Sequence, residues 1–463
     1  MPITAIVLAA GEGTRMKSRH PKVAHKLLDK PIVWWAVNAC REAGVDHIIV
    51  VVGHGADEVR AIFANDEDVE CVEQAKRLGT GHAVRCVRDA VGAFQGPVVV
   101  LTGDAPLIEG ATIAALIEET RAHHNAATVL TMVPPDPTGY GRIKRAEDGS
   151  VLAIIEHKDC TEAERAALTE CNSGIFCFCG RRLSTYIDQI GCNNAQGEYY
   201  LTDMVDIYVR AGEPVSAHAA DDYQELLGIN SRRQLADATR IMQARINGRL
   251  MDAGVTMLDP TQVWVGAKVS VGQDTELLPQ TMLFGDTHVG SDCVIGPNTR
   301  LTDVTVGDGS TVEETVGHAS AIGNGCPIGP RAYLRPGTRV LDGAHVGTHV
   351  EIKNSTIGEG SKVPHLSYIG DTTMGSGVNV GAGSITCNYD GKHKHPTTIG
   401  NDVFIGSDTM MVAPVNIGDG ALIGASSCIT SDVPANALAL ERSRQTVVEG
   451  WASARRKRMQ EEE

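Results

Sequence analysis

An aliphatic residue recurs at every sixth position through much of the second half of the chain. This period is typical of a parallel β-helix, in which each coil stacks its aliphatic residues on those of the coils above and below. Three short strands per coil predict a triangular prism. Such arrays usually wind left-handed, unlike the right-handed crossovers of most parallel sheets. The series comprises Val265, Val271, Leu277, Leu283, Val289, Ile295 and Leu301, then Ile322, Ile328, Leu334, Val340, Val346 and Ile352, and finally Ile399, Ile405, Met411, Ile417, Ile423 and Ile429.

The first half has a different pattern, in which short β-branched runs alternate with helical stretches up to about Leu227. The runs "TAIVLAA", "HIIVVVG" and "GPVVVLTGD" have the character of buried strands, and "KPIVWWAVNACREAG" that of a helix. Strands that alternate with helices predict a mostly parallel, Rossmann-like sheet covered on both faces. Ligands of such folds bind at the carboxyl ends of the strands.

A long helix is expected between these halves. Leu235, Ala238, Met242, Ile246 and Leu250 recur at helical spacing among polar residues, and a glycine and a proline follow. We therefore expect an α/β domain over residues 1–228, a linker helix over 229–252 and a β-helix with a C-terminal tail over 253–463.

Composition excludes several classes of protein. The net charge of -16 argues against a nucleic-acid-binding protein, which needs a basic face. No apolar run is long enough to cross a bilayer, and the run Ile3 to Ala10 is too short for a signal peptide. The 12 cysteines are scattered without a CxxC pair, which favours reduced thiols. We expect a cytoplasmic protein without membrane insertion.

The first strand ends in "GEGTRMKSRHPK", a glycine turn followed by two cations. Gly11 and Gly13 let the backbone approach a ligand, and Arg15 and Lys22 supply positive charge for a phosphate. The sequence is neither a Walker A loop nor GxGxxG. Glycines alone are equally typical of a tight turn, but the two cations favour phosphate binding.

Asp104 follows the buried run "GPVVVLTGDAP". A carboxylate at the ligand edge of the sheet could hold Mg²⁺ against a nucleotide phosphate. An aspartate that only caps a helix or forms a turn explains this segment nearly as well.

Longer motifs in the first half resemble the uridylyltransferase branch of the nucleotide-sugar pyrophosphorylases. They are "LAAGEGTRM", "PKVAHKL", "RLGTGHA", "GDAPL", "DPTGYGRI", "IIEHKD", "CNSGI" and "QGEYYLTD", in family order. The resemblance implies a nucleotidyltransferase domain, in which a sugar 1-phosphate attacks the α-phosphorus of UTP and expels pyrophosphate. It assigns the nucleotide to Leu8, Ala9, Ala10, Gly11, Gln74, Gly79, Thr80, Thr102 and Gly103, the triphosphate and its reaction to Arg15 and Lys22, the sugar to Gly141, Glu156 and Asn172, and Mg²⁺ to Asp104 and Asn230.

The repeat itself departs from its pattern in a way that a plain scaffold does not require. Arg335 and Lys353 follow aliphatic residues where many repeats have glycine, and two cations on nearby coils suit a phosphate. His365 is a candidate base for an amine, although a lone histidine is more often structural. The segment "SITCNYDGKHKHPTTIG" interrupts the six-residue step and predicts a loop that leaves the prism.

The segments "HLSYIG", "NVGAGSITCNYDG" and "VFIGSDT" extend the resemblance to nearly the whole chain. With the first half, they resemble the family of bifunctional N-acetylglucosamine-1-phosphate uridylyltransferases and glucosamine-1-phosphate N-acetyltransferases. The family acetylates glucosamine 1-phosphate with acetyl-CoA before uridylyl transfer and assembles as a homotrimer through the β-helix. It assigns His365 as the general base, glucosamine 1-phosphate to Arg335, Lys353, Tyr368 and Asn379, and acetyl-CoA to Ala382, Asn388, Tyr389, Ser407, Ala425 and Arg442.

Two other functions are weighed against the bifunctional enzyme. A monofunctional pyrophosphorylase would use its β-helix only for assembly, and does not explain Arg335, Lys353 and His365. A non-catalytic scaffold has no need for Arg15 or Lys22. Within the acetyltransferase, Cys387 could form an acyl-enzyme, but direct transfer is favoured because the sequence pairs this cysteine with no base.

Overall fold

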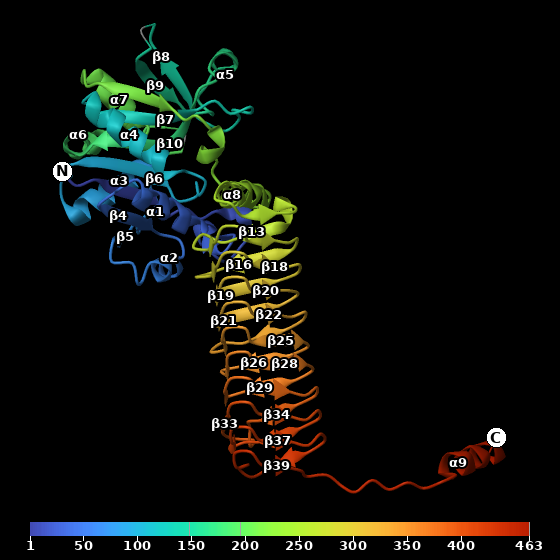
Figure 1. Ribbon diagram of the computed structural model, residues 1–463. Coiled ribbons are helices and arrows are strands. Elements are labelled where there is room, and N and C mark those ends of the chain that lie inside the picture. Colours follow the sequence, from blue (N-terminus) through green and yellow to red (C-terminus); the bar gives the residue numbers. More distant parts are fainter. Residues whose placement is uncertain (148, 195, 463) are drawn as a thin grey trace. The chain divides into compact units, whose positions relative to one another are not determined.

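The computed structural model describes residues 1–147, 149–194 and 196–462, and the chain divides into two compact units, Met1–Arg245 and the chain from Ile246 onward (Figure 1). The first unit carries most of the helices. The helices are α1 (Ile32–Glu42), α2 (Ala56–Ile62), α3 (Thr80–Val91), α4 (Gly110–Ala122), α5 (Glu162–Ala167), α6 (Gly180–Tyr186), α7 (Asp203–Arg210), α8 (Arg232–Asp252) and α9 (Trp451–Glu461).

A central mixed sheet organises the first unit. Strands β6, β1, β4 and β5 run parallel to one another, whereas β10 is antiparallel to both β6 and β7. The predicted Rossmann-like, mostly parallel sheet is confirmed, with an antiparallel strand inside it. The strand order is β11 (Val215–Ala219), β7 (Ala127–Met132), β10 (Cys171–Cys179), β6 (Pro97–Thr102), β1 (Thr4–Leu8), β4 (His47–Val52) and β5 (Val69–Glu73). In addition, β8 (Arg142–Arg145) pairs with β10, β9 (Val151–Ile155) pairs with β8, and β2 (Lys26–Leu27) and β3 (Lys30–Pro31) form a separate hairpin.

Helices cover both faces of this sheet because successive side chains of its strands point to opposite faces. On β1, Ala5 and Val7 join one apolar cluster with residues of α1 and α4. Ile6 points the other way and joins a second cluster with residues of α3, α6 and α7. Burial on both faces explains why these strands read as continuous apolar runs.

The second unit is the β-helix that the repeat predicts. Residues 18 positions apart pair in parallel, such as Ser270 with His288 and Tyr333 with Glu351, so three hexapeptides close one coil. One face comprises β12 (Thr256–Met257), β15 (Glu276–Leu277), β18 (Val294–Ile295), β20 (Thr311–Val312), β22 (Pro327–Ile328), β25 (His345–Thr348), β28 (Lys362–His365), β31 (Asn379–Val380), β34 (Phe404–Ile405), β37 (Leu422–Ile423) and β39 (Leu438–Ala439).

The remaining strands of the β-helix belong to one continuous sheet. They stack coil on coil in Figure 1. They are β13 (Val263–Val265), β14 (Ser270–Val271), β16 (Thr281–Phe284), β17 (His288–Val289), β19 (Arg300–Val306), β21 (Val316–Ile322), β23 (Tyr333–Leu334), β24 (Arg339–Val340), β26 (Glu351–Lys353), β27 (Thr356–Ile357), β29 (Tyr368–Gly370), β30 (Thr372–Met374), β32 (Ile385–Cys387), β33 (Thr397–Ile399), β35 (Met410–Val412), β36 (Val415–Ile417) and β38 (Cys428–Ile429).

The repeat's aliphatic residues form the core of this unit. All of those predicted from the six-residue step are buried in one cluster, except Val271, which packs against it partly exposed. They lie on strands that pair in parallel with those of neighbouring coils, which is why the repeat must persist for the array to be stable.

Replacing Ile352 with alanine should lower the free energy of unfolding by about 2–5 kcal/mol, because its fully buried side chain would leave a cavity between coils. Denaturant unfolding of the full chain measures this loss. As a control, Lys362→Ala changes an exposed side chain on β28 and should alter stability by no more than about 0.5 kcal/mol. Equal losses for the two variants would contradict the assigned core.

Helix α8 spans the division between the units, and each unit binds its own part of the helix. In the first unit, the Arg245 guanidinium donates to the Leu107 carbonyl at 2.6 Å and pairs with Glu109 at 3.2 Å. In the second unit, the buried Asn247 amide donates to the Pro260 and Val263 carbonyls at 2.8 and 2.9 Å. Among the described residues, no helix has both the length and the apolar character needed to cross a membrane.

Candidate substrate sites

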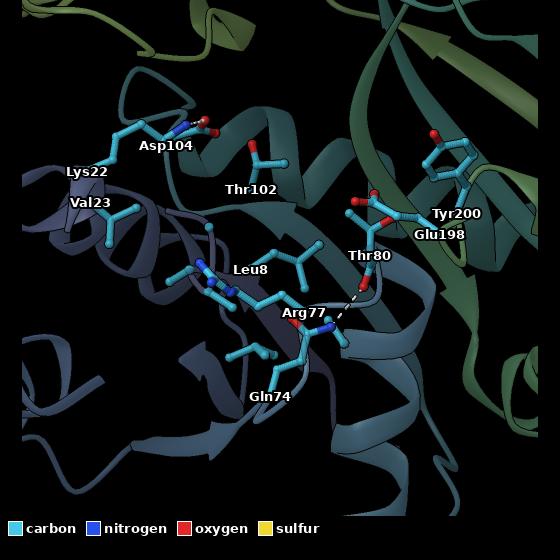
Figure 2. Close-up of a pocket in the computed structure, with 16 residues that line it drawn as sticks. Leu8, Lys22, Val23, Gln74, Arg77, Thr80, Thr102, Asp104, Glu198 and Tyr200 are labelled. Carbon is cyan, nitrogen blue, oxygen red and sulfur yellow. Dashed lines mark hydrogen bonds and ion pairs between the residues drawn. The ribbon is translucent and has the colours of Figure 1, made fainter. Parts of the chain in front are cut away.

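A cavity of about 330 Å³ in the first unit opens at the carboxyl ends of β1 and β6 (Figure 2). This is the edge at which an α/β sheet binds its ligands. Most of the residues predicted to bind UTP line it: Leu8, Ala9, Ala10, Gly11, Lys22, Gln74, Gly79, Thr80, Thr102 and Asp104. Of the other two, Gly103 donates its N–H to the Leu8 carbonyl at 2.9 Å, whereas Arg15 is outside the described lining and lies exposed in the 3-10 helix Thr14–Met16.

The wall of this cavity that precedes α3 is held by backbone and side-chain hydrogen bonds. The buried Gln74 amide donates to the Gly79 carbonyl at 2.9 Å, which fixes the turn before α3. Gly79 has a φ of 107°, and a Cβ there would lie 2.5 Å from the Tyr199 carbonyl oxygen, so this turn requires glycine. The Thr80 hydroxyl accepts the Leu201 N–H at 2.9 Å.

Lys22, Asp104 and Asn230 meet at one end of the cavity, although they lie far apart in sequence. The Lys22 ammonium donates to the Asp104 carboxylate and, at 2.9 Å, to the Asn230 amide oxygen. Figure 2 places Lys22 and Asp104 at the opposite side of the cavity from Glu198 and Tyr200. The two oxygen atoms that bind the Lys22 ammonium would also suit a hard metal ion that has few protein ligands.

A second cavity of about 330 Å³ adjoins the first and is lined by two of the three predicted sugar ligands. Glu156 and Asn172 line it, and it shares Leu8, Thr80 and Tyr200 with the first cavity. Burial raises the pKa of Glu156 above its usual value, and the Thr202 hydroxyl at 3.3 Å partly offsets this effect. Gly141, the third predicted sugar ligand, accepts the Asn172 N–H through its carbonyl at 2.9 Å.

Arg77, Glu198 and Tyr200 also line the first cavity, although the sequence interpretation gave them no role. Their only sequence signal was their place in the motifs "RLGTGHA" and "QGEYYLTD". Arg77 adds a second cation, besides Lys22, to the lining of this cavity and pairs with Glu12 at 3.4 Å.

On the β-helix, Arg335 and Lys353 occupy equivalent positions on consecutive coils. The Arg335 N–H donates to the carbonyl of Ile352 at 2.8 Å, the residue just before Lys353. Glu351 binds the Arg335 guanidinium at 2.8 Å, and the Lys353 ammonium lies 3.4 Å from the Asp371 carboxylate. The two predicted phosphate ligands therefore lie side by side.

The other predicted residues for glucosamine 1-phosphate are divided between two sheets. Tyr368 pairs with Glu351 in the register of β29 and β26, so it lies next to the two cations. His365 ends β28 with an exposed side chain, three residues before Tyr368. Asn379 lies on β31, in the sheet of β28 rather than that of Tyr368.

Three of the residues predicted to bind acetyl-CoA stack at one corner of consecutive coils. The Asp408 N–H donates to the Ala382 carbonyl at 2.7 Å and the Ser426 N–H to the Ser407 carbonyl at 2.8 Å. Arg442 joins this corner by donating to the Ala425 carbonyl at 3.1 Å.

Asn388 and Tyr389 belong to the predicted loop, which folds back on itself. Asn388 is buried and accepts the His395 N–H through its carbonyl at 2.8 Å. Tyr389 is exposed, and the Lys394 ammonium lies 4.4 Å from the centre of its ring. Of the two candidate acetyl-CoA ligands in this loop, Asn388 is therefore held in place and Tyr389 is accessible.

Comparisons with known proteins agree with this division of the chain. Residues 5–183 match the MobA-like NTP transferase domain, and residues 396–431 match the bacterial transferase hexapeptide family. The bifunctional protein GlmU of Heliobacterium modesticaldum is 50% identical over 98% of both chains. Those of Streptomyces avermitilis and Caldanaerobacter subterraneus are 48% and 46% identical over 98% of this chain and 95% and 99% of their own. Identity at this level over nearly the full length shows that the chain belongs to the GlmU family of bifunctional proteins, which confirms the family resemblance of its motifs.

Proposed function

We propose that the chain makes UDP-N-acetylglucosamine in two steps, one in each half. The second half acetylates glucosamine 1-phosphate with acetyl-CoA, and the first half transfers uridylyl from UTP to the N-acetylglucosamine 1-phosphate so formed. We assign uridylyl transfer to residues 1–228 and acetyl transfer to residues 253–463, joined by the linker helix over 229–252. The observation that carries the proposal is that residues assigned to UTP by motif line one cavity of the first unit.

In uridylyl transfer the chain acts by positioning and by charge neutralisation. The sugar-phosphate oxygen attacks the α-phosphorus in line with the departing pyrophosphate. Gln74, Gly79 and Thr80 hold the nucleotide, and Glu156 and Asn172 orient the sugar. Lys22, with Arg15 nearby on the chain, neutralises negative charge that develops on the phosphates.

We assign Mg²⁺ to Asp104 and Asn230, whose oxygens already accept hydrogen bonds from the Lys22 ammonium. Mg²⁺ held there would supply polarisation of the phosphate oxygens. Lys22 would supply positive charge to the triphosphate.

In acetyl transfer His365 takes a proton from the sugar amine, because an ammonium group has no lone pair with which to attack the thioester. Arg335, Lys353, Tyr368 and Asn379 hold glucosamine 1-phosphate. Ala382, Asn388, Tyr389, Ser407, Ala425 and Arg442 contact acetyl-CoA.

Direct transfer is favoured over an acyl-enzyme on Cys387. Burial, with Cys428 as a smaller cause, raises the pKa of the Cys387 thiol. A protonated thiol is a poor nucleophile. The acetyl group therefore passes directly from CoA to the amine: the C–N bond forms, the C–S bond breaks, His365 holds the proton from the amine, and CoA leaves as the thiolate.

We further propose a homotrimer assembled through the β-helix. An apolar row supports this assembly: Phe404, Leu422 and Leu438 pair in register on β34, β37 and β39, with 48%, 45% and 62% of each residue exposed. A contiguous exposed apolar surface is typical of an interface.

Sedimentation equilibrium should give about three times the chain mass of 49.1 kDa, and Leu422→Glu should shift the protein toward monomers. A wild-type protein of monomer mass would contradict the trimer.

Separate assays of the purified chain test the two activities. Glucosamine 1-phosphate and acetyl-CoA should release free CoA, and N-acetylglucosamine 1-phosphate, UTP and Mg²⁺ should release pyrophosphate. If the chain releases pyrophosphate but no CoA, it is a pyrophosphorylase with a purely structural β-helix. We place both reactions in the cytoplasm, because the 12 cysteines are free thiols.

A further inference from the structure

The Asp371 carboxylate lies at the centre of a polar cluster on the β-helix. The Asn388 amide donates to its Oδ2 at 2.6 Å and the Asn354 amide to its Oδ1 at 2.8 Å. The Lys353 ammonium lies 3.4 Å from both oxygens. The Asp371 side chain is only 13% exposed, so these partners replace most of its contact with water.

The backbone fixes the direction of this carboxylate. Asp371 has a φ of 51°, in the left-handed region that aspartate tolerates better than most residues. Its N–H donates to the Lys353 carbonyl at 3.0 Å, and its carbonyl accepts the Thr397 N–H at 3.1 Å. Asp371 is thus anchored both to the strand of Lys353 and to the chain that leaves the loop.

Gly370 provides the space that the cluster needs. Arg335 and Lys353 occupy the equivalent position on the two preceding coils. A Cβ at Gly370 would lie 2.4 Å from the Tyr368 hydroxyl and 2.6 Å from the Asn388 amide nitrogen. The missing side chain allows this amide to reach the Tyr368 hydroxyl at 3.4 Å as well as Asp371.

Burial and the neighbouring groups determine the pKa of Asp371. Burial raises the pKa of Asp371, but hydrogen bonds from Asn354 and Asn388 and the charge of Lys353 outweigh burial and hold this pKa below its usual value. Asp371 is therefore an anion at neutral pH. The two amides lie closer to it than the ammonium does, so they fix the carboxylate and leave Lys353 more freedom to turn toward a phosphate.

From this arrangement we infer that Asp371 is a positioning residue for acetyl transfer. Its carboxylate orients Lys353 on the side of glucosamine 1-phosphate and Asn388 on the side of acetyl-CoA, and so couples the two substrate sites through one side chain. This inference rests on the proposed function of the second half. Asp371 itself contacts neither reacting atom.

The variant Asp371→Asn tests this role. The substitution removes the negative charge beside Lys353. The NH₂ group of the new amide would also face the donating NH₂ group of Asn354 or Asn388. The KM values for glucosamine 1-phosphate and for acetyl-CoA should each rise about tenfold, the loss expected for a hydrogen bond to a charged group. Uridylyl transfer from N-acetylglucosamine 1-phosphate should be unchanged.

A double-mutant cycle separates positioning from a structural effect. The rise in KM for acetyl-CoA should disappear in an Asn388→Ala background, and the rise in KM for glucosamine 1-phosphate should disappear in a Lys353→Ala background. Asp303→Asn is the matched control, because Asp303 also has a left-handed backbone (φ 57°) and accepts the Asp286 N–H at 2.8 Å. It should leave both KM values unchanged.

Several outcomes would overturn the inference. A change of less than twofold in Asp371→Asn, or a rise in KM that is the same in every background, would make Asp371 purely structural. If the asparagine variant does not fold, Asp371→Gly takes its place, because glycine accepts a φ of 51°. Absence of acetylation by the wild-type chain would overturn the proposed function together with this inference, whereas normal acetylation with an unaffected variant would overturn the inference alone.

Discussion

Replacing His365 with alanine should lower acetyl transfer by roughly 10²- to 10⁴-fold, the contribution expected of a general base. The amine of glucosamine 1-phosphate is then left without a group to accept its proton. His365 is exposed at the end of β28, near Tyr368, so its removal creates no cavity in the core. The loss of activity is measured as the rate at which free CoA is released from acetyl-CoA in the presence of saturating glucosamine 1-phosphate.

The same His365→Ala variant should convert added N-acetylglucosamine 1-phosphate and UTP at the wild-type rate, because the proposed uridylyl site lies in the other unit. His349→Asn is a matched control: His349 is also exposed, on the preceding coil, and asparagine tolerates its φ of 56°. This control should retain both activities. An equal loss of both activities in His365→Ala would refute the assignment of separate sites.

Replacing Asp104 with alanine should lower uridylyl transfer by at least about 10²-fold, as removal of a group that stabilises transition-state charge commonly does. The variant loses a proposed metal ligand and the anion that holds Lys22. Pyrophosphate release from UTP and N-acetylglucosamine 1-phosphate measures the effect, and excess EDTA should abolish the wild-type reaction in the same assay.

Acetyl transfer should be unchanged both in Asp104→Ala and in the presence of EDTA. Asp57→Ala is the matched control in the same unit, because the Asp57 side chain is fully exposed in α2, and it should retain both activities. Normal uridylyl transfer by Asp104→Ala in Mg²⁺ would refute the metal role of this carboxylate.

The fold could be predicted where the spacing of the aliphatic residues indicates directly which side chains are buried. A six-residue step has one structural solution, so the core of the β-helix could be named residue by residue, from Leu334 and Ile352 to Ile429. Strand direction is different. The apolar run of β10 looks the same in either direction, because burial on both faces leaves no alternation to read, and its antiparallel pairing with β6 and β7 emerged only in three dimensions.

The candidate sites were predictable where long motifs carried the assignment. Lys22, Asp104 and Asn230 were singled out separately, and the sheet brings them into hydrogen-bond contact across more than 200 residues of sequence. Asp371 could not be found in this way. Its role depends on a left-handed corner and on the space left by Gly370, and neither the repeat nor the charge pattern reports these features.

The central claim is that one chain carries out both steps, with acetylation first. The most direct test incubates the purified wild-type chain with glucosamine 1-phosphate, UTP and Mg²⁺, with and without acetyl-CoA, and measures the UDP-sugars formed. We expect UDP-N-acetylglucosamine only when acetyl-CoA is present. If no UDP-sugar forms even with acetyl-CoA, while added N-acetylglucosamine 1-phosphate is converted, the β-helix does not acetylate and the account is contradicted.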